Sequence, residues 1–148
     1  MTIVDQPILK FTGKYAFLSN FWSCRVRGID GEIYPSVEHA FQAAKALPER
    51  YDIRAAFRVA PSCSDVKKAG RRIQLRPDWE DVKDSIMYQL VKDKFMRNDY
   101  LRTLLISTGT AHLEEGNNHN DKYWGTVDNV GKNKLGNILM QVRSELSD

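Results

Sequence analysis

Residues 34–45 read Tyr34-Pro-Ser-Val-Glu-His-Ala-Phe-Gln-Ala-Ala-Lys45, and the rest of the fold is inferred outward from this segment. Ser36 predicts a helix N-cap, because its hydroxyl can accept a hydrogen bond from a free amide of the first turn. A rotation of about 100° per residue then gathers the apolar side chains of the segment on one face. Glu38, Gln42 and Lys45 follow the edge of that face at positions i, i+4 and i+7. The segment therefore predicts a helix with a buried face and a carboxylate, an amide and an amine in one line.

Two interpretations of this polar line are open. Glu38 falls in the first turn, where the helix dipole favours an ionised carboxylate, and this suits a base or nucleophile better than an acid. The alternative is an ordinary solvated edge, on which Glu38 and Lys45 form only weak pairs along the helix. The spacing alone favours the solvated edge.

The composition sets the broad class of the protein. A chain of 148 residues with 42% hydrophobic and 28% charged residues fits one globular domain with a buried core. We expect a cytoplasmic protein, because no apolar run approaches the roughly 20 residues of a membrane span and the first ten residues do not form a signal peptide. The net charge of +3 permits binding of phosphate or nucleic acid but does not indicate it. Cys24 and Cys63 have no metal-ligand spacing, so reduced thiols are expected.

The other elements follow from similar patterns. Cys24–Ile29 and Glu32–Tyr34 predict a hairpin, because Asp30-Gly31 between them suits positive φ. Short strands are expected at 8–11 and 111–114. Further helices are expected at about 53–60, after Ser62 or Ser64, from Asp78 to about Phe95, from Asp99 to a stop at Thr108-Gly109, and from Leu135 to Leu146. The predicted fold class is α+β: a single helix-rich domain over residues 1–148, with a core from about 11 to 146 and a few short strands.

Two loops and one short helix carry polar groups that suit function. The segment 115–125 is too polar for a regular element, and loops of this kind often hold functional side chains. Gly131–Gly136 leads into the last helix and either cradles a phosphate on free amides or forms only a tight turn. The helix after Ser62 carries Lys67, Lys68, Arg71 and Arg72. Of its charges, Arg71 and Arg72 join Lys45 as phosphate candidates, and the alternative is that they are solvated.

Several motifs taken together resemble a known family. They are Leu18-Ser-Asn-Phe21, the 34–45 segment, Gly70-Arg71, Arg76-Pro-Asp-Trp79, Glu115-Gly-Asn117, Asp121-Lys-Tyr-Trp-Gly125 and Gly131-Lys-Asn-Lys-Leu-Gly136. In this order they resemble the NADAR family of YbiA-like N-glycosidases over about residues 17–143. The resemblance implies cleavage of a bond between a ribose carbon and a nitrogen. It implies as substrates the phosphoribosylamino intermediates of riboflavin synthesis or, in other branches, ADP-ribose attached to guanine.

The resemblance also assigns roles to individual residues. It implies that Glu38, Lys45 and Asp121 are catalytic, and we predict that all three face one pocket with Trp124. The substrate-binding candidates are Asn20, Trp22, Tyr34, Gln42, Arg71, Trp79, Trp124, Gly125 and Asn133. His119 departs from the pattern, because similar sequences carry an aromatic residue there. Alternative interpretations remain open for Asp121, which can hold its own loop, and for Trp79, which can be a core anchor.

Two chemical routes fit these residue types. In a direct route a carboxylate stabilises the positive charge that builds on the sugar, and another group orients water. In a covalent route the amine of Lys45 attacks the anomeric carbon and forms a Schiff base with the opened sugar. Glu38 and Lys45 are about 10 Å apart along the helix axis, at roughly 1.5 Å per residue, so their side chains can reach one sugar. The sequence ranks the two routes equally.

Three functions are therefore weighed. The first is an N-glycosidase acting on a small phosphoribosyl metabolite, and the second removes ADP-ribose from guanine in nucleic acid. The third is a module that binds ADP-ribose or a nucleotide without cleaving it, and the two carboxylates disfavour it. No cofactor is expected, and three histidines without a His-x-x-x-His spacing give little support to a metal site.

Overall fold

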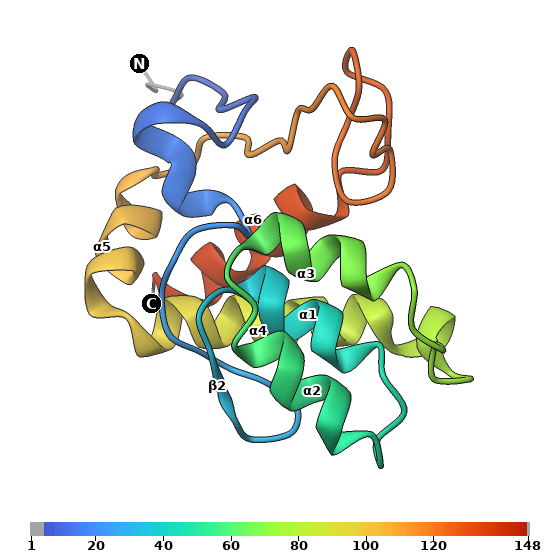
Figure 1. Ribbon diagram of the computed structural model, residues 1–148. Helices are drawn as coiled ribbons and strands as arrows, with labels where there is room; N and C mark the ends of the chain where they lie inside the picture. The colour runs from blue at the N-terminus through green and yellow to red at the C-terminus, as the bar shows by residue number, and fades with distance from the viewer. Residues whose placement is uncertain (1–4, 148) are drawn as a thin grey trace. The chain divides into compact units, whose positions relative to one another are not determined.

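The computed structural model describes residues 5–147, and the helices dominate it (Figure 1). In chain order the elements are η1 (Gly13–Leu18), β1 (Val26–Arg27), β2 (Ile33–Tyr34), α1 (Val37–Ala44), α2 (Tyr51–Arg58), α3 (Cys63–Gly70), α4 (Trp79–Arg97), α5 (Asp99–Ser107) and α6 (Lys134–Leu146). A helix-rich α+β fold with a two-stranded sheet is confirmed. The chain divides into two compact units, Asn20–Asn98 and the described parts of Met1–Ser19 with Asp99–Asp148. The single domain expected from the chain length stays a prediction.

Helix α1 is the centre of the unit Asn20–Asn98 and contacts α2, α3, α4 and both strands (Figure 1). The hydroxyl of Ser36 accepts a hydrogen bond of 3.0 Å from the amide of His39, so the predicted N-cap is confirmed. Every residue from Val37 to Ala44 is buried, including the polar ones. Glu38 and Gln42 therefore do not lie on a solvated edge. Neighbouring helices cover the polar side of α1 as well as its apolar face.

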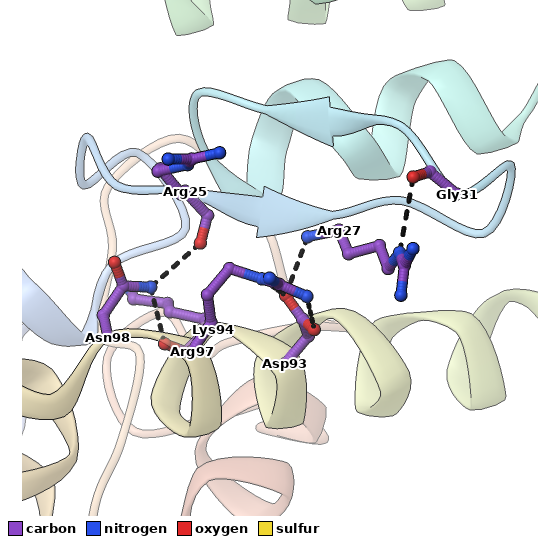
Figure 2. A network of polar contacts seen from close by, with 7 residues as sticks. All are labelled: Arg25, Arg27, Gly31, Asp93, Lys94, Arg97 and Asn98. Atoms are coloured by element: carbon purple, nitrogen blue, oxygen red, sulfur yellow. Dashed lines mark hydrogen bonds and ion pairs between the residues drawn. The ribbon is translucent and has the colours of Figure 1, made fainter.

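The hairpin of this unit is fixed on α4 by a network of polar contacts (Figure 2). The backbone amide of Arg27 donates to Asp93 at 2.7 Å, and Arg97 makes two hydrogen bonds of 2.9 Å to the same carboxylate. Asn98 donates from its side chain to the carbonyl of Arg25 at 2.9 Å. The strands are shorter than predicted, and Gly31 adopts φ +86° in the turn, as the Asp30-Gly31 pair indicated.

Helix α4 begins with Trp79, whose ring packs on Phe41 of α1 with centroids 5.0 Å apart. Its buried residues include Ile86, Leu90 and Phe95, which the predicted stripe contained. Asp78 stands at the N-cap position but makes no side-chain cap, because its carboxylate binds the Arg76 guanidinium at 2.6 Å. The helix start is therefore held by a local ion pair instead of a cap.

The other unit contains η1, α5, α6 and the long loop between α5 and α6 (Figure 1). The strands expected at 8–11 and 111–114 are reduced to one parallel bridge between Ile8 and Leu113. Gly109 ends α5 with φ +62°, and Asp5 accepts hydrogen bonds from the amide and hydroxyl of Thr110 just beyond it. No helix between residues 5 and 147 combines the length and apolar content that a membrane crossing needs.

Candidate functional site

Glu38 is buried near the start of α1, with 7% of its surface exposed. Its amide donates to the carbonyl of Asn20 at 3.0 Å, which ties the Leu-Ser-Asn-Phe motif to this turn. Its carboxylate oxygen Oε1 accepts a hydrogen bond of 2.9 Å from the side-chain amide of Gln42. Burial raises the pKa of Glu38, and the hydrogen bond from Gln42 and the positive charges of Lys67 and Lys45 oppose this rise without cancelling it.

The direction of that pKa corrects the expectation from the sequence. The position in the first turn favours an ionised carboxylate, but the desolvation of Glu38 acts in the opposite direction and is larger. The side chain therefore holds its proton to a higher pH than an exposed glutamate. A carboxyl group of this kind can act as a general acid as well as a base.

Gln42 joins α1 to α3 at this point. It is 4% exposed, and its Oε1 is buried without a hydrogen-bond partner among the described residues. Gly70 of α3 lies directly against it, and a Cβ added at residue 70 would collide with Oε1 of Gln42. The glycine thus permits the close approach of α3 that buries the Glu38–Gln42 pair.

Lys45 follows α1 and is half-buried. Burial lowers the pKa of its amine. The charge of Glu38 raises this pKa, whereas the like charges of Arg71, Lys67 and Lys83 lower it further. A lysine with a lowered pKa is more often neutral and so a better nucleophile, as the covalent route needs.

Other candidates of the same unit have different roles. Tyr34 is 1% exposed and donates its hydroxyl to Asp30 at 2.7 Å, so it has a structural role in the hairpin, and its substrate contact stays a prediction. Burial and the neighbouring carboxylate both raise the pKa of Tyr34. Trp79 is also buried, and its contact with Phe41 supports the alternative interpretation as a core anchor. Trp22 is half-buried.

Asn20 and Arg71 are two further candidates for substrate binding. The Asn20 amide lies 3.5 Å from the sulfur of Met87, a weak contact for an amide donor. Arg71 is exposed at the C-cap of α3. Their substrate contacts stay predictions.

Asp121 and Trp124 lie in the loop 115–126 of the other unit. Oδ1 of Asp121 accepts hydrogen bonds from the amides of Tyr123 at 3.0 Å and Trp124 at 2.9 Å. The alternative interpretation, that Asp121 holds its own loop, is therefore true of Oδ1. Its other oxygen, Oδ2, accepts no hydrogen bond from the described residues. The indole of Trp124 is half-buried and meets the ring of Tyr123 edge to face at 4.8 Å.

Asn117 organises this loop, a role that the sequence alone did not predict. Its Nδ2 donates to the carbonyls of Asp121 at 2.9 Å and Thr126 at 3.0 Å, and its Oδ1 accepts from the amide of Asp121 at 3.0 Å. Gly125 is required nearby, because a Cβ there would collide with the carbonyl of Glu115. An asparagine between glycine-rich turns is the signal that could have identified it.

At the N-terminus of α6 the observed bonds favour the tight turn over the phosphate cradle. The loop 122–125 folds back onto it, and its carbonyls accept four amides: Lys132 to Lys122 (2.8 Å), Asn133 to Gly125 (3.2 Å), Lys134 to Tyr123 (3.1 Å) and Leu135 to Trp124 (2.9 Å). The side chain of Asn133 accepts from the Glu115 amide and donates to the Leu113 carbonyl, which gives it a structural role. Its substrate contact stays a prediction.

The structure thus gathers part of the predicted site in each unit. Glu38, Gln42 and Lys45 lie together on α1, with charges of α3 and α4 acting on them. Asp121, Trp124 and Gly125 share one loop of the other unit. The joint action of the two sets stays a prediction.

The histidines do not join either set. The ring of His39 bonds to the Ser36 hydroxyl at 2.7 Å and to the Ala60 carbonyl at 3.0 Å, so its role is structural. His119 is exposed in the loop. Between residues 5 and 147, no three His, Cys, Asp or Glu side chains come together as a metal site would require.

Comparisons with known proteins agree over nearly the whole chain. The family model of the NADAR domain matches residues 10–147. N-glycosidase YbiA of Shigella flexneri is 40% identical, and that of Escherichia coli K12 is 37% identical; each alignment covers 98% of this chain and 92% of the relative. A riboflavin biosynthesis protein of Vibrio vulnificus is 35% identical over 99% of this chain and 40% of its own length. The NMR structure of E. coli YbiA matches with a TM-score of 0.84 at 36% identity, covering 99% of this chain and 88% of that one.

Proposed function

The chain belongs to the NADAR family, and from this premise we propose that it is an N-glycosidase that hydrolyses a ribosyl–nitrogen bond in a phosphate-bearing small molecule. Relatives named N-glycosidase YbiA align with nearly its full length. A relative named for riboflavin biosynthesis supports phosphoribosylaminopyrimidines as the substrate class. The observation that carries the proposal is the placement of a buried carboxyl group, Glu38, in α1 and a half-buried amine, Lys45, at the C-cap of the same helix.

The proposed chemistry uses Glu38 as the group that exchanges a proton with the leaving nitrogen. Its raised pKa favours the protonated form more than in an exposed glutamate, and loss of the proton to the leaving nitrogen leaves a carboxylate beside the positive charge of the sugar. Gln42 holds Oε1 of this group in place through its hydrogen bond. The fixed orientation reduces the reorganisation that the reaction would otherwise require.

Lys45 is the proposed nucleophile of the covalent route. The neutral amine attacks the anomeric carbon, and the carbon–nitrogen bond to the base breaks as the leaving nitrogen takes up a proton. The sugar ring opens to give a Schiff base, which water hydrolyses to release the sugar phosphate and restore the amine. The lowered pKa of Lys45 supports this route over the direct one, in which only a positive charge would be needed.

Asp121 is proposed to orient the attacking water. Its Oδ1 is occupied by two backbone amides, which fix the carboxylate, and Oδ2 remains for a ligand. Trp124, which Asp121 holds through the backbone, is proposed to stack on the base of the substrate.

The test is release of ribose 5-phosphate from a phosphoribosylaminopyrimidine by purified protein, followed by mass spectrometry. Glu38→Gln should reduce turnover by about 10² or more, because it removes the proton-transferring group but keeps the shape. Glu49→Gln is the matched control, since Glu49 is exposed beyond α1. Full activity of Glu38→Gln would reject the proposed role of the carboxyl group. Cleavage of ADP-ribosylated guanine alone would instead favour the nucleic-acid function, and binding without cleavage of either compound would favour the binding module.

A further inference from the structure

Three cationic side chains act on Lys45 and have no part in the chemistry above. Lys67 and Arg71 belong to α3, and Lys83 belongs to α4. All three lower the pKa of the Lys45 amine by like-charge repulsion. Their positions follow from how α3 and α4 pack on α1.

Helices α1 and α3 lie side by side and run in the same direction. At their starts, the sulfur of Cys63 lies 3.4 Å from the Ser36 hydroxyl. At their ends, Gly70 lies against Gln42. Cys63, Lys67, Gly70 and Arg71 stand at i, i+4, i+7 and i+8 and so share one face of α3. Because two members of that face touch α1, the other two, Lys67 and Arg71, face α1 as well.

The burial of the lysines on α3 agrees with this orientation. Lys67 is half-buried, and its amine lies 5.9 Å from the ring centroid of Phe21. Phe21 follows Asn20 in the sequence, and the Asn20 carbonyl accepts the hydrogen bond from the Glu38 amide. Lys68 is exposed on a different face of the same helix, and so is Arg72. Lys67 is therefore not one of the solvated charges of α3.

Lys83 adds a charge from α4. Its side chain is 18% exposed and forms an ion pair of 2.8 Å with Glu80. The four cations Lys45, Lys67, Arg71 and Lys83 face two carboxylates, Glu38 and Glu80, so positive charge is in excess here. Two further ionisable groups lie close to Glu38. The ring of His39 is bonded on both sides, and burial raises the pKa of the Cys63 thiol, so neither adds negative charge here. Partly buried like charges repel one another, and a bound anion removes this repulsion.

We propose that Lys67 and Arg71 form a subsite that binds the phosphate monoester of the substrate beside Glu38 and Lys45. This inference rests on the proposed function and adds to it the residues that recognise the phosphate group of the substrate. Cationic side chains bind phosphate through short, charge-assisted hydrogen bonds, and Arg71 can offer two at once.

The test compares two substrates, a phosphoribosylaminopyrimidine and its dephosphorylated ribosyl counterpart. Lys67→Gln should lower kcat/KM for the phosphorylated compound about tenfold more than for the dephosphorylated one. The ratio cancels any change that Lys67→Gln causes in Glu38 or Lys45, because those residues act on both compounds. Lys68→Gln is the matched control and should leave the ratio unchanged. Equal losses for both compounds with Lys67→Gln would overturn the subsite.

A binding measurement separates failure of the subsite from failure of the proposed function. Ribose 5-phosphate and ribose are titrated into wild type, Lys67→Gln and Lys68→Gln by calorimetry. The subsite predicts that wild type and Lys68→Gln bind ribose 5-phosphate at least tenfold more tightly than ribose and that Lys67→Gln loses this preference. If neither aminopyrimidine is cleaved, this titration still tests the subsite. No preference for the phosphate in wild type would overturn it.

Discussion

The side chain of Gln42 donates a hydrogen bond of 2.9 Å to Glu38, and both residues lie on the buried side of α1. The two stand at i and i+4, so the bond forms within one helix face. The packing of Gly70 against Gln42 holds the amide from the other side. The position of the candidate catalytic carboxyl group therefore depends on a glycine in another helix.

Gly70→Ala should destabilise the fold. Alanine in a helix is normally more stable than glycine by about 0.5–1 kcal/mol, so intrinsic propensity predicts the opposite sign. The added Cβ instead collides with Gln42 and displaces the amide from Glu38. We expect a lower free energy of unfolding in urea and a loss of turnover. An alanine variant more stable than wild type would show that Gln42 can move away freely.

Glu38→Gln should make the protein more stable at neutral pH while making it less active. The folded state raises the pKa of Glu38 above the ordinary value of 4.5, so the folded protein binds this proton more tightly than the unfolded chain does. Wild type must then lose stability as the pH rises from about 4.5 to the raised pKa, by at most about 1.4 kcal/mol for each pH unit. Glutamine does not ionise, so this part of the pH dependence is absent from the variant.

The measurement is urea unfolding of wild type and Glu38→Gln from pH 4 to pH 8. The stability difference should be smallest at pH 4 and grow with pH in favour of the variant. A difference that stays constant across this range would mean that Glu38 titrates as it does in the unfolded chain.

The helices were predictable because their signals are local. Ser36 and Ser62 both cap the helices that follow them, and both accept the amide three residues later. The hairpin also depends on neighbours in sequence. The expected strand around Ile8 instead depends on Leu113, more than a hundred residues away, and only one bridge forms.

The site was less predictable, because its properties depend on contacts distant in sequence. The residue types on α1 are visible in the sequence, but the pKa direction of Glu38 depends on burial by other helices. The amides at the start of α6 look free in the sequence, yet the loop 122–125 occupies them. Lys67 and Lys68 are adjacent and chemically identical, and only the packing of α3 distinguishes them.

Lys45 distinguishes the two chemical routes. If its amine forms a Schiff base, borohydride added during turnover should attach the sugar covalently to Lys45, and mass spectrometry of a digest should locate it. Lys45→Arg should then be inactive, because the guanidinium is always charged and is not a nucleophile. The direct route predicts no adduct and partial activity of the arginine variant, since a positive charge is retained.

Asn133→Ala should weaken the start of α6. The side chain of Asn133 bonds to the Glu115 amide and the Leu113 carbonyl, and each buried group left unpaired costs about 1–3 kcal/mol. Its backbone also has φ +51°, a conformation that alanine adopts less easily than glycine. Urea unfolding should therefore rank wild type above Asn133→Gly and Asn133→Gly above Asn133→Ala. Equal stability of the glycine variant and wild type would exclude a contribution from the two hydrogen bonds.

Trp124→Ala should weaken substrate binding without unfolding the loop. Asp121 holds this position through the backbone amide of Trp124, which every substitution except proline retains. The indole is half-buried and pairs with the Tyr123 ring in a T-shaped contact, so we expect its loss to affect stability less than binding. Stacking of a base on an aromatic side chain contributes roughly 1–3 kcal/mol, and KM for the aminopyrimidine substrate should rise accordingly. Trp124→Phe keeps an aromatic face and should recover most of the affinity. If Trp124→Ala keeps its affinity for substrate but unfolds at lower urea concentration, the indole is a core residue of the loop and not a platform for the base.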